Sequence, residues 1–85
     1  MSIVYIYAEQ NDPGDSELII HQQLFQNGGH VSIGEVIFVV EGSKALFDIE
    51  SSNSGIIISK VTEGSFVKVG SVIAEIQVES SPLDD

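Results

Sequence analysis

The chain has 85 residues, of which 42% are hydrophobic and 19% are charged, and this composition is typical of one small globular domain. Thirteen acidic and three basic residues give a net charge of −10, which argues against nucleic acid and anionic membranes as partners, because phosphate contacts need clustered Lys and Arg. The chain has no cysteine, so disulfides and thiolate metal sites are both excluded.

The first predicted element is a β-strand over residues 3–7, where aliphatic and aromatic residues follow one another without a charge. No basic segment precedes this strand, and no apolar run in the chain reaches the roughly 20 residues that span a bilayer. We therefore predict a cytoplasmic protein without a secretory signal or a membrane segment. Asp12, Pro13, Gly14 and Asp15 then mark a turn.

The next strands are predicted over residues 18–25, 36–40 and 45–49, which are rich in β-branched and aromatic residues. The last two are separated only by a short polar break, and the alternation after this break directs Phe47 and Ile49 toward the core. This spacing predicts a tight hairpin with a polar tip.

The remaining strands are predicted over residues 56–61 and 72–78, which follow turns at residues 51–55 and 63–65. No segment has a convincing helical stripe with caps. Short strands at regular spacing predict an all-β sandwich or barrel. Its core is predicted to hold all four phenylalanines, Phe25, Phe38, Phe47 and Phe66.

An internal repeat divides the strands into two similar units with an offset of 36 residues, the separation of Gly28 and Gly64. Gly34 matches Gly70 at the same offset, and aliphatic residues are in phase around both glycine pairs. Each unit reads as a strand, a glycine turn, a short strand, a second glycine and a longer strand. Two such units predict two small sheets in a pseudo-twofold arrangement. Upstream the repeat thins to two matches, Ile20 with Ile56 and Phe25 with Val61.

Lys44 lies at the tip of the predicted hairpin, and the chain has only two other basic residues, Lys60 and Lys68. A single ammonium among many acids has little purpose as a salt bridge, but it is well placed for covalent attachment of a group. In such a turn Gly42 gives the backbone freedom, and Ser43 can bond locally to the backbone. The plain alternative is an ordinary solvated lysine, which is how we interpret Lys60 and Lys68 on their outward strand positions.

The hairpin tip reads Glu41, Gly42, Ser43, Lys44 and Ala45. Together with a glycine just after the hairpin and the glycine–aliphatic pattern of both repeat units, this tip resembles the lipoyl/biotinyl attachment domain family over residues 13–76. Lipoyl domains, the closest members, typically carry Glu-Thr-Asp-Lys-Ala at this place. The chain keeps the Glu, the Lys and the Ala of that motif, while Gly42 and Ser43 replace Thr and Asp.

The resemblance implies an all-β fold, a flattened barrel-sandwich hybrid of two four-stranded sheets with internal pseudo-twofold symmetry and the lysine on a hairpin tip. Both termini then lie at the end opposite the lysine. From its length we expect residues 1–85 to form a single domain, here a carrier domain, with residues 1–2 and the polar residues 79–85 frayed. It implies lipoate covalently attached to Lys44, with four flanking recognition residues, Glu41, Gly42, Ser43 and Ala45.

The function that the resemblance implies is that of a non-catalytic, monomeric carrier, which passes acyl groups or electrons between enzymes of a 2-oxoacid dehydrogenase-like system. A lipoate-attaching ligase or transferase is then a further partner. Biotinyl domains typically place Met on both sides of the lysine, and Ser43 and Ala45 at these positions favour lipoate over biotin. A biotin carrier for a carboxylase and an unmodified interaction module of the same fold are the alternatives.

Other polar residues give weaker indications. In lipoyl domains the loop that corresponds to residues 8–15 lies beside the lysine and contributes to recognition by dehydrogenase partners. Glu9, Asp12 and Asp15 are candidates for that part, against the plain alternative of solvated loop acids. The two histidines, His21 and His30, have no spacing from the acids that resembles a metal-ligand motif. We therefore predict neither catalytic residues nor a metal site.

Overall fold

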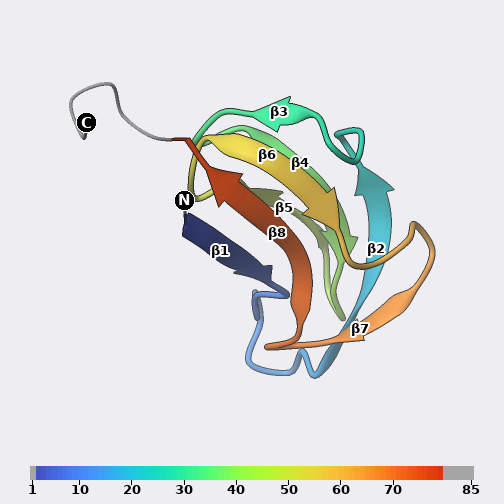
Figure 1. The fold of residues 1–85 in the computed structure, drawn as a ribbon. Coiled ribbons are helices and arrows are strands. Elements are labelled where there is room, and N and C mark those ends of the chain that lie inside the picture. The colour runs from blue at the N-terminus through green and yellow to red at the C-terminus, as the bar shows by residue number, and fades with distance from the viewer. Residues whose placement is uncertain (1, 80–85) are drawn as a thin grey trace.

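The computed structural model describes residues 2–79, which form two four-stranded antiparallel sheets (Figure 1). The strands are β1 (Ser2–Tyr7), β2 (Glu17–Gln23), β3 (His30–Val31), β4 (Val36–Glu41), β5 (Leu46–Glu50), β6 (Gly55–Ser59), β7 (Phe66–Lys68) and β8 (Val72–Val78). One sheet has the order β1-β8-β6-β3, and the other has the order β5-β4-β2-β7. The prediction of an all-β sandwich with two four-stranded sheets is confirmed. Residues 2–79 contain no helix long and apolar enough to cross a membrane.

The two sheets repeat one another. Exchanging β1 with β5, β8 with β4, β6 with β2 and β3 with β7 converts one strand order into the other. The hydrogen bonds at the sheet ends recur as well, since Gly34 N donates to Ser51 O and Gly70 N donates to Ala8 O, each at 2.8 Å. Both sheets also contain a register shift at the equivalent place, where the edge strand meets its neighbour. The predicted pseudo-twofold symmetry is therefore confirmed.

His21 is an extra residue that one repeat unit has and the other lacks. The register of β2 against β4 shifts between Ile20 and Gln22, which makes His21 a bulged residue. The offset before this bulge is consequently 37, the separation of Ile20 and Ile57, which are both fully buried. The predicted match of Ile20 with Ile56 is wrong, because Ile56 lies on the outer face of its sheet and is exposed.

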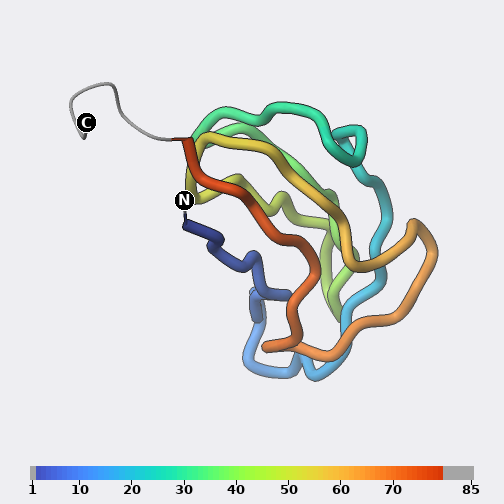
Figure 2. The backbone as a smooth tube through the Cα atoms, in the orientation of Figure 1, coloured from blue at the N-terminus to red at the C-terminus, as the bar shows by residue number. Residues whose placement is uncertain are grey.

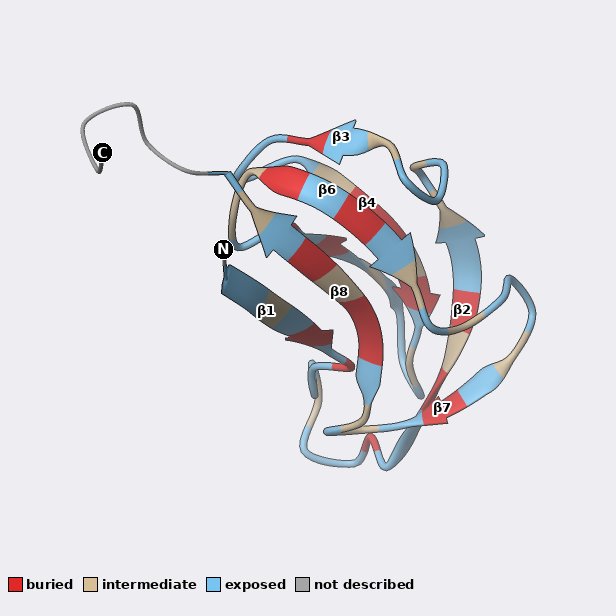
Figure 3. Cartoon of the chain, in the orientation of Figure 1, coloured by how far each residue is buried: buried red, intermediate tan, exposed pale blue. Residues whose placement is uncertain are grey.

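The core lies between the sheets and is supplied by the inward residues of strands in both of them (Figure 3). Phe38 is fully buried, and the ring of Phe25 meets it edge-on with a centroid distance of 5.2 Å. Phe47 packs against the same cluster, as the alternation predicts. Phe66 is 68% exposed, so its assignment to the core is wrong. Its neighbour Val67 is the inward residue of β7, and alternation along the strand turns Phe66 to the outside.

Both ends of the described chain have backbone partners. Ser2 lies opposite Val78, and Glu79 N donates to Ser54 O at 3.0 Å. The predicted fraying of residues 1–2 and 79–85 stays a prediction, and residue 1 and residues 80–85 lie outside the described residues. The N-terminal end of the chain lies beside the end of β8, whereas β4 runs away from that end and leads into the β4–β5 hairpin (Figures 1 and 2).

Candidate functional site

The turn between β4 and β5 is a tight reversal with Lys44 at its tip. Gly42 N donates to Ala45 O at 2.9 Å, so Ser43 and Lys44 are the two central residues of the turn. Neither of them has a positive φ, which distinguishes this turn from the primed types that usually close two-residue hairpins. Lys44 thus lies where the sequence predicts it, between two paired antiparallel strands.

Asp15 fastens this turn from the neighbouring loop between β1 and β2. Its side chain is buried, with 4% of the residue exposed, and its Oδ1 accepts hydrogen bonds from Ser43 N at 2.8 Å and from Ser43 Oγ at 2.7 Å. Its Oδ2 accepts a hydrogen bond from Asp12 N at 3.0 Å. The bond from the Ser43 N–H is the main reason that the pKa of the Asp15 carboxyl lies below its ordinary value, although burial acts in the opposite direction. A charged carboxylate therefore joins the loop to the hairpin tip.

Gly42 makes room for this carboxylate. A Cβ atom at position 42 would lie 2.9 Å from Oδ2 and 3.0 Å from Oδ1 of Asp15. Gly42 has no positive φ, so the close approach of Asp15, and not a special backbone conformation, requires a glycine here. Ser43 likewise bonds to a distant residue and not to the local backbone. The expectations that Gly42 supplies turn freedom and that Ser43 bonds locally are both wrong.

Lys44 presents its amine to solvent. Its side chain is 76% exposed, and its Nζ lies 3.6 Å from Asp12 Oδ2. This ion pair contradicts the expectation that the ammonium has no salt-bridge role, but an exposed pair contributes at most about 1 kcal/mol. Asp12 is itself held in place, because its Oδ1 accepts a hydrogen bond from Gly14 N at 2.8 Å. The amine is therefore paired only at the surface and stays open to a reacting partner.

The predicted site residues all border one shallow hollow of about 320 Å³ beside the turn. Two residues that the sequence does not assign to the site, His21 and Leu46, line it as well. His21 reaches the hollow from β2, and its position follows from the bulge that pairing with β4 creates. The whole lining is His21, Glu41, Gly42, Ser43, Lys44, Ala45 and Leu46.

The three acids of the β1–β2 loop differ in what they can offer a partner. Asp15 is buried against the hairpin and is not available for direct recognition. Asp12 is partly exposed beside Lys44, and Glu9 is exposed. Of the candidates for a recognition role, the structure therefore leaves Asp12 and Glu9 at the surface and makes Asp15 a positioning residue for the turn.

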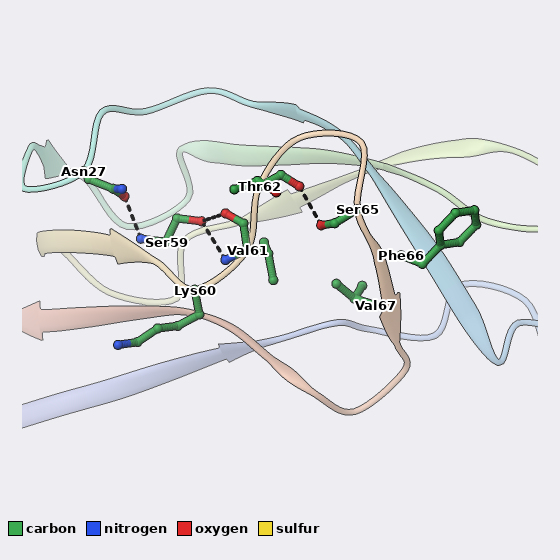
Figure 4. A pocket seen from close by; sticks show the side chains of 8 residues that line it. All are labelled: Asn27, Ser59, Lys60, Val61, Thr62, Ser65, Phe66 and Val67. Atoms are coloured by element: carbon green, nitrogen blue, oxygen red, sulfur yellow. Dashed lines mark hydrogen bonds between the residues drawn. The ribbon is translucent and has the colours of Figure 1, made fainter.

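A larger hollow of about 630 Å³ lies at the β6–β7 turn, but it has no converging reactive groups (Figure 4). Its polar atoms bond to one another, since Ser59 N donates to Asn27 Oδ1 at 2.7 Å and Ser65 Oγ donates to Thr62 O at 2.6 Å. Lys60 points away from the centre of the hollow. Within residues 2–79, no group of three or more His, Asp or Glu side chains is placed to hold a metal ion.

Comparison with known families identifies the segment that contains the hairpin. Residues 11–76 match the biotin/lipoyl family model, which carries the description "Biotin-requiring enzyme". The matched segment runs from the loop with Asp12 and Asp15, through the hairpin with Lys44, into β8. No curated protein matches the chain.

Proposed function

Since the chain belongs to the biotin/lipoyl attachment domain family, we propose that Lys44 carries its covalent group and that this group is lipoate. Domains of this family are carrier modules of multienzyme systems, and they hold lipoate or biotin on a lysine that a ligase modifies. The protein then acts as a non-catalytic carrier in the cytoplasm, with residues 1–85 as one carrier domain. Its partners are a lipoate-attaching enzyme and the enzymes of a 2-oxoacid dehydrogenase-like system.

The observation that carries this proposal is the hairpin that Asp15 fastens. A swinging group needs an anchor whose backbone is fixed and whose side chain is free. The two hydrogen bonds from Ser43 to Asp15 fix the residue that precedes Lys44, whereas the Lys44 side chain is largely exposed. These features fit an attached acyl group, because the amine reaches solvent from a turn that cannot easily shift.

The other two lysines offer a poorer anchor. Lys60 follows the end of β6, and its Nζ lies 3.3 Å from Glu75 Oε2 on the sheet surface. Lys68 is the last residue of β7, which is an edge strand. Neither residue is a central residue of a tight turn between paired strands. Lys44 is therefore the best of the three lysines as the anchor of a covalent group.

Attachment balances as an ordinary acyl transfer. The Lys44 ammonium first loses a proton, and the neutral amine attacks the carbonyl carbon of a lipoyl-adenylate. The new C–N bond forms, the C–O bond to AMP breaks, and the nitrogen gives up a second proton as AMP leaves. The amide product has no charge, so the ion pair with Asp12 is lost. The attached dithiolane supplies the acyl-transfer and redox chemistry. The chain contributes the position of the anchor, its exposure and the acidic surface around it.

Lipoate is favoured by the residues on either side of Lys44. Biotinyl domains typically have Met at both positions, whereas this chain has Ser43 and Ala45. The Ser43 hydroxyl donates a hydrogen bond to Asp15 Oδ1 at 2.7 Å. A Met at position 43 would remove that donor. The tip is therefore built around a short hydroxyl side chain.

Modification by a lipoate ligase tests the proposal, with intact-mass analysis as the readout. Wild type, Lys60→Arg and Lys68→Arg should each gain one lipoyl group, and Lys44→Arg should gain none. A lipoyl adduct on the Lys44→Arg variant would show that another residue is modified and would contradict the assignment of Lys44. If the native protein binds streptavidin, the attached group is biotin and not lipoate. A native protein without any mass increment, in cells that modify other carriers normally, would support the unmodified interaction module.

A further inference from the structure

The edge strand β1 lacks the protection that exposed sheet edges usually have. Within residues 2–79, β1 pairs only with β8 and forms one edge of its sheet. Its sequence, SIVYIY, contains no charged residue and no proline, and its one register shift lies at the far end, between Ile6 and Tyr7. Most of the strand is exposed (Figure 3). Natural sheets commonly block such an edge with a charge, a proline or a central bulge, because an open edge pairs with other strands.

The second sheet provides an internal comparison, because β5 occupies the equivalent edge there. By the pairing register, Tyr5 corresponds to Asp48 and Tyr7 corresponds to Glu50. The outward positions on β5 therefore carry two carboxylates, whereas the same positions on β1 carry two half-exposed tyrosines. One fold thus contains a charged edge and an uncharged edge at matching places.

The outer face next to β1 extends the uncharged edge into an apolar patch. The strand register aligns Ile3 with Ile56 across β8, and Tyr5 with Ile58 in the following row. A shallow hollow of about 240 Å³ between these rows is large enough to take a side chain from a partner. The exposed apolar residues of the patch are Ile3, Tyr5, Tyr7, Ile56 and Ile58.

The two acidic side chains in and beside this patch both contact side chains of the same chain. Glu75 lies on β8 between Tyr5 and Ile58, within the second row, and its Oε2 is 3.3 Å from Lys60 Nζ. At the border of the patch, Glu79 contacts His30. The carboxylate of Glu75 is thus paired with a lysine and that of Glu79 contacts a ring nitrogen of the same chain, so neither is left free for a basic peptide. A second copy of the same edge would present β1 itself, which carries no charged side chain along its length.

From these observations we infer that two copies of this chain pair antiparallel along β1 and form one continuous sheet across a twofold axis. Antiparallel pairing of an edge strand with its own copy is self-complementary, since each side presents the same donors and acceptors. The tyrosines and isoleucines of both copies then cover one another. The net charge of −10 opposes the approach of two copies at long range, so added salt strengthens the dimer by screening that repulsion. This inference is independent of the group on Lys44.

Sedimentation velocity of the full chain tests the pairing, from about 10 µM to about 1 mM protein, a range suited to a small interface. The dimer fraction should rise with concentration, and it should rise further between about 0.05 M and about 0.5 M NaCl. The double variant Tyr5→Asp/Tyr7→Glu copies the charges of β5 onto β1 and should weaken the dimer at least about tenfold. Ile33→Asp, at an exposed apolar residue outside the patch, is the matched control and should leave the dimer unchanged.

If the double variant folds poorly, amide hydrogen exchange of the wild-type protein tests the pairing instead. Alternate amides of β1 should be protected at high protein concentration and exposed at low concentration. A chain that stays monomeric overturns the inference. In that case, fast exchange of the β1 amides would show that the edge is open and available to a different partner. Protected β1 amides would instead show that another segment of the chain covers the edge. A dimer that is indifferent to Tyr5→Asp/Tyr7→Glu also overturns it. The same sedimentation data test the sequence-based prediction of a monomer.

Discussion

Gly42→Ala tests whether Asp15 dictates the glycine at the hairpin tip. The new methyl group would lie 2.9 Å and 3.0 Å from the two carboxylate oxygens of Asp15, so either the carboxylate or the turn must move. Inserting a group into a packed site of this kind costs about 2 kcal/mol. In a domain of 85 residues, this corresponds to a decrease in Tm of about 8–16 °C.

The assay is thermal unfolding of wild type, Gly42→Ala, Asp15→Ala and the double variant. Without the Asp15 carboxylate the methyl group has room, so Gly42→Ala should cost less than about 0.5 kcal/mol in that background. Gly28→Ala is the control, because its φ of +84° and open surroundings make its cost purely conformational and equal in both backgrounds. An equal cost of Gly42→Ala with and without Asp15 would refute the reasoning and return the glycine to a backbone role.

Three further predictions concern the pH dependence, the symmetry and the surface pair. The pKa of Asp15 is lowered when folded, so its stabilising effect is complete above the ordinary value of 3.8 and is lost as the pH falls through the lowered pKa. An NMR titration should therefore show the Ser43 amide shifting with a midpoint below 3.8, and a midpoint at or above that value would contradict the hydrogen bonding. Ile20→Val and Ile57→Val should each cost about 0.5–1.5 kcal/mol, and Ile56→Val less than about 0.5 kcal/mol, by denaturant unfolding. A greater cost at position 56 than at position 57 would instead support an offset of 36 throughout. Asp12→Asn should change the unfolding free energy by less than about 0.5 kcal/mol, since the Lys44 pair is exposed, and a loss above about 1 kcal/mol would show a stronger contact.

The repeat and the alternation of side chains account for the parts of the fold that were predictable. The glycine pairs and the apolar runs predict two equivalent sheets, and the polar break in the middle predicts the hairpin with Lys44. The same alternation could have placed Phe66 outside, because Val67 and Lys68 already define the two faces of β7. Its assignment to the core relied on residue type alone.

The supports of the site were not predictable, because they join residues that are distant in sequence. Ser43 bonds to Asp15 across 28 positions, and nothing local marks either residue as a partner of the other. His21 gives no signal of its own, since a bulge becomes visible only when β2 is aligned with β4. Gly42 looks like an ordinary turn glycine until the carboxylate beside it is known.

The central claim is that this hairpin displays Lys44 as the anchor of a covalent group. Fragmentation mass spectrometry of the native protein tests it most directly, because it locates any modification at a single residue. We predict one lipoyl amide on Lys44 and unmodified side chains at Lys60 and Lys68. A lipoyl group on either of those two lysines, or a native chain whose three lysines are all free in cells that lipoylate other proteins, would contradict the account.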